Sequence, residues 1–464
     1  MHKIHELCNR AWQETTIPDE WGKSILVPIP KKGDLSDCSN YRTISLISHM
    51  GKILLMVLLN RLKQYLDPYL AEGQAGFRKD RSTIHQILIL RLLAEKAKRN
   101  GKKIYNCFID FQKAFDTVEH KVIWAVLRSY GVDNKMVTLL EKIYEKSQSA
   151  VRLGTDIGEW FKTSVGTRQG DPLSPLMFIA YLDRVMDKIK QENSGVNISG
   201  TQVNNLRFAD DIDLLDEDCD SLHQQMEKIK QVSEQAGLIM NTTKTKTMVF
   251  GNKQIEEEIH VKDMKIENVE KFEYLGSLLT WDNNCSEEIG RRINKAIGAM
   301  SNLNHIWKTT NIKVENKLKL LKTCVFSTLL YASETWTVKE KDKKKLLAFE
   351  MKCYRRILGI RWKDMVRNTD VRKKISANET IIDIIKKKKL RLFGHICRMD
   401  DTRLVKHTLF SRMNGTSRRG RPCREWLDDI TEWGGRSCQE LVHLAQNRDQ
   451  WKKMIRTMVG PDGR

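Results

Sequence analysis

Strand-like and helix-like patterns of apolar residues alternate along the first 280 positions of the chain. Short apolar runs predict strands at 24–29 and 102–110, and apolar residues at helical spacing predict helices at 44–66, 82–100 and 174–190. Further segments have the alternation and turn residues of hairpins, and they lie at 149–170, 206–215 and 271–280. This mixture predicts an α+β fold built around a small sheet.

The pattern changes close to residue 280. Helical spacing dominates beyond Trp281, and basic residues gather there in "KEKDKKK", "KKKKLRLF" and "SRRGRPCREW". We therefore expect a boundary near 280, with a mainly helical, basic region after it.

The net charge of the chain indicates which class of partner the protein binds. The 464 residues include 80 Lys and Arg against 59 Asp and Glu, which gives a formal net charge of +21. An excess of this size favours a polyanionic partner such as nucleic acid. No apolar run is long enough to span a bilayer, and the N-terminus lacks the pattern of a signal peptide. We expect an intracellular protein of the nucleus or cytoplasm without a membrane partner.

The ten cysteines contain no C-x-x-C pair, so the sequence predicts free thiols rather than a redox pair or a zinc ribbon. A zinc site assembled near the C-terminus is a weaker alternative, because the ligand spacings match no closed site. Its candidate ligands are His395, Cys397, Cys423, Cys438 and His443.

Two carboxylates, Asp210 and Asp211, interrupt the apolar stretch "LRFADDIDLL". Burying an ionised carboxylate is costly unless it is paired or bound to a metal. Asp110 ends a second strand, and pairing of the two strands would bring all three aspartates to one edge of the sheet. Oxygen ligands favour Mg²⁺ or Mn²⁺, and a pair of such ions serves phosphoryl and nucleotidyl transfer.

A calcium loop is an alternative for the acidic stretch that follows. Asp216, Asp218 and Asp220 occupy positions 1, 3 and 5 of a twelve-residue loop, and Glu227 occupies position 12. Position 6, however, is Ser221 where the loop needs glycine. A helix that begins near Asp220 or Ser221 explains the stretch better.

Seven motifs in order resemble those of reverse transcriptases, and specifically those of non-LTR (LINE-type) retrotransposons. The resemblance covers roughly residues 20–280. The finger motifs are "VPIPKKGDLSDCSNYRTISLIS" and "QAGFRKDRST", and the palm motifs are "CFIDFQKAFDTVEH", "GTRQGDPLSPLMF", "LRFADDIDLL", "GLIMNTTKTKTMVF" and "FEYLGSLLT". These elements usually carry an endonuclease domain before the polymerase, so we expect a fragment, a truncated copy or the product of a decayed element.

The resemblance implies a catalytic centre. Asp110, Asp210 and Asp211 match the metal-binding aspartates, which would hold two Mg²⁺ ions, with Mn²⁺ as an alternative. Lys244 matches the lysine proposed as general acid toward pyrophosphate, although nearby Lys246 competes for that assignment.

The resemblance also implies substrate contacts. Phe115 matches the aromatic residue that excludes a 2′-hydroxyl, and Gln169 and Gly170 match the turn beside the incoming nucleotide. The open alternatives are a core position for Phe115 and an ordinary turn for the other two. The basic residues Lys31 and Arg42 match cations that hold the triphosphate, and Arg78 matches one that touches the template backbone; a solvated surface role is the alternative for each.

The expected architecture is that of a right-hand polymerase followed by a basic C-terminal region. It has fingers at 1–100, a palm with a small antiparallel sheet at 101–280, a helical thumb at 281–380 and a mainly helical nucleic-acid-binding tail at 381–464. In that tail "RRGRPC" is similar to minor-groove hooks, with a solvated surface as the alternative.

The implied activity is RNA-directed DNA polymerisation with an RNA template, a DNA primer and deoxynucleoside triphosphates. The rivals are a catalytically silent nucleic-acid-binding relic or host-recruited fragment, and a two-metal nuclease. The nuclease leaves the nucleotide-side motifs unexplained.

Overall fold

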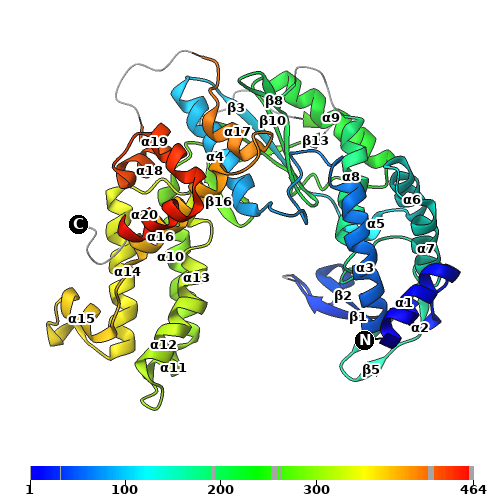
Figure 1. The fold of residues 1–464 in the computed structure, drawn as a ribbon, viewed down its shortest axis with the longest axis horizontal. Coiled ribbons are helices and arrows are strands. Elements are labelled where there is room, and N and C mark those ends of the chain that lie inside the picture. The colour runs from blue at the N-terminus through cyan, green and yellow to red at the C-terminus, as the bar shows by residue number, and fades with distance from the viewer. Residues whose placement is uncertain are drawn as a thin grey trace.

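The computed structural model describes residues 2–31, 33–189, 194–251, 260–261, 264–415 and 423–458. Figure 1 shows an arch. A sheet with its helices forms the crown, one arm carries the N-terminal elements, and the other arm carries the helices from α10 (Cys285–Asn302) to α15 (Asn368–Ile375). The expected α+β fold is confirmed.

The crown is built on a five-stranded sheet in the order β14-β11-β3-β10-β9. The central strand, β3, pairs antiparallel with both β10 and β11, and all six of its residues are buried. Because side chains alternate along a strand, Cys107 and Ile109 enter one core while Ile104 and Phe108 enter another. The strands are β3 (Ile104–Ile109), β9 (Asn205–Phe208), β10 (Asp211–Asp216), β11 (Lys246–Phe250) and β14 (Glu267–Asn268).

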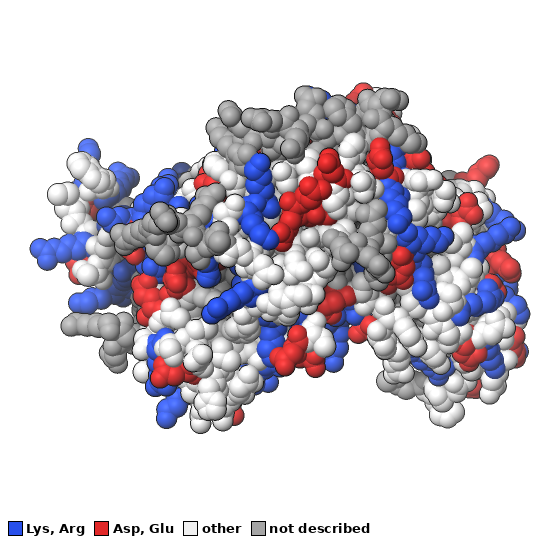
Figure 2. Space-filling model, turned by 90° about the horizontal axis from the view of Figure 1, so that it is seen from above, with Lys and Arg blue, Asp and Glu red and all other residues white. Residues whose placement is uncertain are grey.

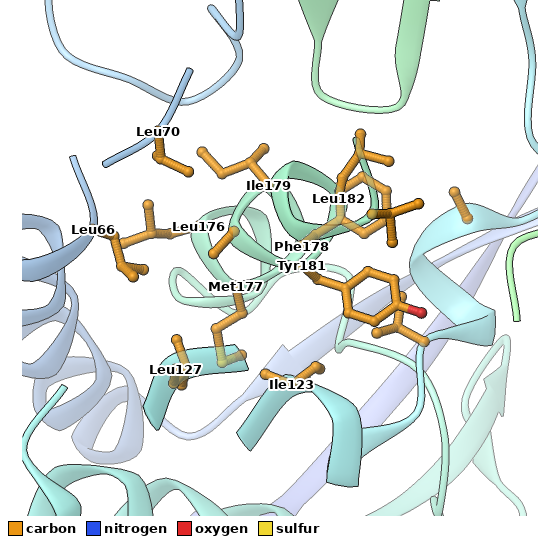
Figure 3. Packing of buried hydrophobic residues seen from close by; sticks show 14 of the residues in the cluster. Leu66, Leu70, Ile123, Leu127, Leu176, Met177, Phe178, Ile179, Tyr181 and Leu182 are labelled. Atoms are coloured by element: carbon orange, nitrogen blue, oxygen red, sulfur yellow. The ribbon is translucent and has the colours of Figure 1, made fainter. Parts of the chain in front are cut away.

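Helix α8 (Ser174–Asp187) lies at the centre of the first core. Nearly all of its residues are buried, as expected for a helix that is apolar on every side. Figure 3 shows Leu66 and Leu70 on one side of it, and Ile123 and Leu127 on another. The surrounding helices are α3 (His49–Leu66), α5 (Ala114–Thr117), α6 (His120–Ser129), α7 (Asn134–Glu145) and α9 (Cys219–Gln235).

A second sheet, in the order β2-β1-β4-β5 with β6 beside β4, lies in the N-terminal arm. The helix predicted to begin at residue 44 is wrong at its start, because Ile44 to Ile47 belong to β2. The β-branched Ile44 pairs with Val27 across the strands, and Ser48 caps α3 by accepting a hydrogen bond from the Gly51 N–H. The elements are α1 (His2–Glu14), α2 (Asp19–Gly22), β1 (Lys23–Pro30), η1 (Cys38–Asn40), β2 (Tyr41–Ile47), β4 (Gln148–Leu153), β5 (Asp156–Ile157) and β6 (Phe161–Lys162).

Among the described residues, three two-stranded pairs complete the sheet structure before the chain becomes helical. The hairpin predicted at 271–280 is confirmed as β15 (Lys271–Tyr274) and β16 (Ser277–Thr280). The other short strands are β7 (Val196–Ile198), β8 (Thr201–Val203), β12 (His260–Val261) and β13 (Met264–Lys265).

Beyond Thr280 the described residues contain helices and no strands, as the sequence predicts. The arm helices enclose a third core, and the remainder return to the crown. These elements are α11 (Asn304–Lys308), α12 (Val314–Leu320), the π-helix η2 (Leu321–Phe326), α13 (Ser327–Leu329), η3 (Ser333–Thr335), α14 (Glu340–Leu358), η4 (Trp362–Asp364), α16 (Ile381–Cys397), α17 (Leu404–Phe410), α18 (Trp426–Gly434), α19 (Cys438–Gln446) and α20 (Arg448–Met458).

The C-terminal helices pack on α4 (Thr83–Arg99) as part of the second core. The amide of Asn100 donates to the Met413 carbonyl at 2.9 Å, and the Trp426 N–H donates to Glu95 at 3.1 Å. Through these partly buried hydrogen bonds and the shared core, the helices after residue 381 pack as part of the crown.

Most lysines of the run at 386–389 form ion pairs within the protein. Lys389 is fully buried, donates to Asp429 at 2.6 Å and donates to the Trp336 carbonyl at 2.9 Å. Lys388 pairs with Glu334 at 3.0 Å, and Lys387 pairs with Glu379. A sequence run that predicts a polyanion-binding face is thus held mostly by internal carboxylates.

Candidate active site

The β9–β10 hairpin carries two of the three candidate carboxylates at its tip. Phe208 pairs with Asp211 across a two-residue turn made of Ala209 and Asp210. Ala209 has a φ of +61°, in a region that residues with a side chain seldom adopt. The turn therefore needs support from outside the hairpin.

Gln74 and Gly76 supply that support. The Ala209 N–H donates to Gln74 Oε1 at 3.1 Å, and the Gly76 N–H donates to the same oxygen at 2.8 Å. A Cβ on Gly76 would lie 2.3 Å from the Ala209 nitrogen, so only glycine fits there. We call Gln74 and Gly76 the hairpin clamp. Both residues belong to the finger motif "QAGFRKDRST", in which the sequence analysis assigns a role only to Arg78. The sequence signal for the clamp is a glycine two residues after a glutamine.

Asp110 follows directly after β3. Ile109 pairs with Ile212, so the next pair outward sets Asp110 opposite Asp211. The backbone of Asp110 is held by Asn241, whose N–H donates to the Asp110 carbonyl at 2.8 Å. The backbone register thus places the three aspartates at one end of the central sheet.

Lys244 is the lysine that reaches this sheet end. Its Nζ lies 3.6 Å from Asp110 Oδ2, and its side chain is 69% exposed. Lys246 lies on β11 and pairs with Glu267 at 2.5 Å. The ambiguity between the two lysines is therefore resolved in favour of Lys244 as the neighbour of the aspartates.

Burial and mutual repulsion act on the carboxylates. Burial, with the charges of Asp210 and Asp110, raises the pKa of Asp211 to about 6. Burial also raises the pKa of Asp210, to which Asp110 adds and which Arg42 opposes. The site thus concentrates negative charge that a cation would relieve.

The donor set fits a hard divalent cation. Asp110 Oδ2 is buried and accepts no hydrogen bond among the described residues, and the three side chains offer only oxygen. Yet no three His, Cys, Asp or Glu side chains of the described ranges form a group that could hold a metal ion as they stand. Metal binding by Asp110, Asp210 and Asp211 therefore stays a prediction.

The predicted nucleotide-side turn lies against β2. The Ser45 N–H donates to the Gln169 carbonyl at 2.6 Å, and a Cβ on Gly170 would lie 2.5 Å from the Ser45 oxygen. Gly170 has a φ of +122°, which also requires glycine. Gln169 joins Arg42, which donates to it at 3.3 Å, to Asp116, which accepts from it at 3.1 Å.

Phe115 lies beside this chain of contacts on α5. Its ring stacks on that of Phe178 with centroids 4.2 Å apart, and its carbonyl accepts from the Thr167 N–H at 2.7 Å. The ring is partly buried, so a role against the nucleotide sugar stays a prediction. Lys31 is exposed just beyond β1, and its triphosphate role also stays a prediction.

Arg78 is not among the groups brought to the sheet end. Its guanidinium donates to Asp67 at 2.8 Å and to the carbonyls of Ala71 at 2.7 Å and Leu70 at 3.2 Å. Its side chain is 4% exposed. These bonds favour a role in holding the loop before α4, and contact with the template stays a prediction.

The acidic stretch after β10 starts a helix. Asp218, in place of the expected Asp220 or Ser221, caps α9 by accepting from the Ser221 N–H at 2.8 Å. Asp216 is buried and accepts from Gln225 at 2.6 Å and from Ser221 Oγ at 2.7 Å. The helix interpretation is confirmed over the calcium loop.

Three other sequence expectations concern the C-terminal cysteines, the basic hook and the membrane. All ten cysteines lie in the described ranges, and none of them forms a disulfide. Residues 418–422 of "RRGRPC" lie outside the described residues. Among the described helices none combines the length and the apolar character needed to cross a bilayer.

Comparison with known proteins decides the family. A family described as "Reverse transcriptase (RNA-dependent DNA polymerase)" matches residues 29–279, which is more than half of the chain. The chain belongs to the reverse transcriptase family. All ten site residues predicted from the sequence lie inside the matched range, and reverse transcriptases generally use divalent metal ions.

The relatives of this reverse transcriptase are proteins of non-LTR retrotransposons, as its motifs indicate. The Pol polyprotein from the type-1 retrotransposable element R2 of Nasonia vitripennis is 28% identical over 56% of this chain and 25% of its own length. The RNA-directed DNA polymerase from mobile element jockey of Drosophila funebris is 22% identical over 80% of this chain and 41% of its own length. The chain thus spans between about a quarter and two fifths of these relatives.

Among solved structures, apo telomerase from Candida tropicalis is 12% identical, with a TM-score of 0.45, over 88% of this chain and 74% of that one.

Proposed function

We propose that this chain is an RNA-directed DNA polymerase that extends a DNA primer with deoxynucleoside triphosphates on an RNA template. The observation that carries the proposal is the placement of Asp110 opposite Asp211, with Asp210 beside them in the hairpin turn, at one end of the central sheet. Family membership supplies the reaction class, and the backbone register that brings Asp110 beside Asp211 supports the proposed site.

In this proposal Asp110, Asp210 and Asp211 hold two Mg²⁺ ions, with Mn²⁺ as an alternative. The bound ions would favour ionisation of the primer 3′-hydroxyl and offset the charge that develops on the phosphates. Lys244, which already approaches Asp110, donates a proton to the pyrophosphate oxygen as the bond to phosphorus breaks.

The nucleotide lies between the sheet end and β2. Arg42 and Lys31 bind the triphosphate through charge-assisted hydrogen bonds. Gly170, which has no side chain, lets the backbone approach the base and sugar, and Gln169 fixes the position of Arg42. The ring of Phe115 lies under the sugar and excludes a 2′-hydroxyl.

We assign residues 1–100 to the fingers, 101–280 to the palm, 281–380 to the thumb and 381–464 to a C-terminal region. Figure 1 places the central sheet at the crown of the arch, the proposed thumb in one arm and most of the proposed fingers in the other. Two parts cross these bounds, because α4 of the fingers range packs in the crown and β4 of the palm range pairs with β1 in the N-terminal arm. The template–primer duplex would pass between these arms.

Primer extension tests the proposal. The purified chain is incubated with a labelled DNA primer on an RNA template, Mg²⁺ and all four deoxynucleotides. A polymerase lengthens the primer to the template end and stops early when one nucleotide is omitted. A shortened primer would indicate a nuclease, and a shifted but unchanged primer would indicate a binding protein; either result contradicts the proposal.

A further inference from the structure

A wide groove lies on the helical arm, between α11, α14 and the segment from η4 to α15. It has a volume of about 1260 Å³. Figure 1 places α15 at the far end of this arm, away from the β9–β10 hairpin that carries the candidate carboxylates. The volume of the groove exceeds that of most small-molecule pockets, so the groove has room for part of a polymer chain.

The lining of the groove is strongly basic. Of the described residues that line it, seven are Lys or Arg and none is Asp or Glu. Only Arg372 among these cations has an ion-pair partner within the described ranges, which is Glu350 at 2.8 Å. The six cations without such a partner are Lys308, Lys344, Lys352, Arg355, Arg356 and Arg361.

This basic lining contrasts with the lysine run at 386–389, in which Lys387, Lys388 and Lys389 each form an ion pair with a carboxylate of the same chain. Figure 2 shows Lys and Arg side chains at the end of the molecule where Figure 1 places α14 and α15. The groove is therefore a better candidate for the polyanion contact that the net charge of +21 predicts than that lysine run.

An aromatic platform stands at the rim of the groove. Trp362 is 85% exposed and neighbouring Met365 is 78% exposed, more than any other large hydrophobic residue among those described. Because the Trp362 ring is exposed, it contributes little to the stability of the fold. It is available to stack on a partner that has a flat apolar face.

Hydrogen bonds within the protein hold the backbone around Trp362 before any ligand binds. The Arg361 N–H donates to Asp364 at 2.7 Å, the Ile360 N–H donates to the Arg355 carbonyl at 2.9 Å, and Arg355 donates to the Val366 carbonyl at 3.0 Å. A pre-organised loop loses little conformational entropy when a ligand binds.

We infer that this groove binds a single-stranded stretch of the RNA that the chain copies, with an unpaired base stacked on Trp362 and phosphates paired with the surrounding cations. Stacking needs a base outside a duplex, which a single strand offers. The choice of RNA over DNA rests on the proposed function, in which RNA is the long single-stranded substrate. The groove would hold template at a distance from the catalytic carboxylates.

Binding of a fluorescein-labelled single-stranded RNA, measured by anisotropy without nucleotides, tests the inference. Trp362→Ala should weaken binding by roughly tenfold, since stacking on an aromatic side chain is worth about 1–3 kcal/mol per base. Trp362→Phe keeps a ring and should restore most of the affinity. Because the side chain is exposed, the fold should be unchanged, which circular dichroism checks.

A triple variant tests the charges. Lys344→Gln, Lys352→Gln and Arg361→Gln together should reduce the slope of log affinity against log salt by roughly 2, at about 0.7 per phosphate contact on a single strand. The matched control removes three exposed lysines elsewhere, Lys3, Lys121 and Lys188, and should leave the slope nearly unchanged.

Unchanged RNA affinity in both groove variants would overturn the inference. If the two groove variants lost as much affinity for single-stranded DNA of the same sequence as for the RNA, the assignment of the groove to RNA would be overturned. Primer extension on a short hybrid duplex separates this result from the proposed function. An inactive chain with Trp362-dependent RNA binding contradicts only the polymerase proposal, whereas an active chain without such binding contradicts only the groove.

Discussion

At the residue scale, the sequence predicts which residues lie at the sheet end better than it predicts the hydrogen bonds and ion pairs of each one. Asp110 and Asp211 could be expected to meet because Asp110 follows the end of one apolar strand and Asp211 begins another, and antiparallel pairing sets the end of one strand beside the start of its partner. The positions of Lys244 and Lys246 could not be separated on sequence alone. Their difference depends on Glu267, a pairing partner that approaches β11 only in the folded sheet.

Because only Lys244 lies near Asp110 while Lys246 pairs with Glu267, substitutions of the two lysines form a test and its matched control. Lys244→Ala should lower kcat by about 10²-fold or more while leaving primer binding nearly unchanged, because a general acid contributes typically 10²- to 10⁴-fold. Lys246→Ala loses only an ion pair with a largely exposed carboxylate and should retain near-normal kcat. Single-nucleotide incorporation under single-turnover conditions measures both; equal rates for the two variants would rule out Lys244 as the acid.

Phe115 offers a second test at this scale. Phe115→Val should increase ribonucleotide incorporation relative to deoxynucleotide incorporation, because the smaller side chain no longer blocks a 2′-hydroxyl. The stack on Phe178 would be lost in the same variant, so the thermal midpoint should be measured alongside. A fall in stability with unchanged sugar discrimination would leave Phe115 as a core residue only.

At the scale of elements, the hairpin that presents Asp210 and Asp211 depends on the clamp formed by Gln74 and Gly76. Gly76→Ala places a Cβ where the Ala209 nitrogen lies, so the hairpin tip must shift. We expect at least a tenfold loss of incorporation rate and a loss of stability of about 1–3 kcal/mol, as for other overpacked sites. Gly298→Ala in α10, where a Cβ meets nothing within 4 Å, is the control and should leave the rate unchanged. Equal rates for both variants would contradict the clamp.

The contact between α4 and the C-terminal helices should make stability depend on pH. Burial raises the pKa of Glu95, which accepts hydrogen bonds from Trp426 and Thr337, to about 7. The folded protein therefore binds this proton more tightly than the unfolded chain does. Stability contributed by this group is present at low pH and falls as the pH rises toward 7, by at most about 1.4 kcal/mol per pH unit.

Glu95→Gln should flatten this dependence between pH 5 and 7. Chemical denaturation of both proteins across that range measures the slopes. A wild-type slope that the substitution does not change would show that Glu95 is already ionised when folded.

At the scale of the whole molecule, the sequence predicts the order of elements and the change to helices near 280. It did not predict that the segment after 381 packs into the crown. The reason lies in the partners of the basic run, because Glu334 and Asp429 reach Lys388 and Lys389 only in the folded chain. A count of charges along the sequence cannot distinguish paired lysines from unpaired ones. In the fold, six of the seven cations that line the groove on the helical arm have no ion-pair partner among the described residues.

The central claim is that the carboxylates at the sheet end carry out RNA-templated nucleotidyl transfer. The most direct test is the rate of a single deoxynucleotide addition on an RNA template with Mg²⁺, for wild type, Asp210→Asn and the control Asp156→Asn, an exposed position on β5. We predict addition by the wild type and the control, and a loss of at least about 10²- to 10³-fold in Asp210→Asn with primer–template binding retained. Undiminished addition by Asp210→Asn, or no addition by a folded, template-bound wild type, would contradict the account.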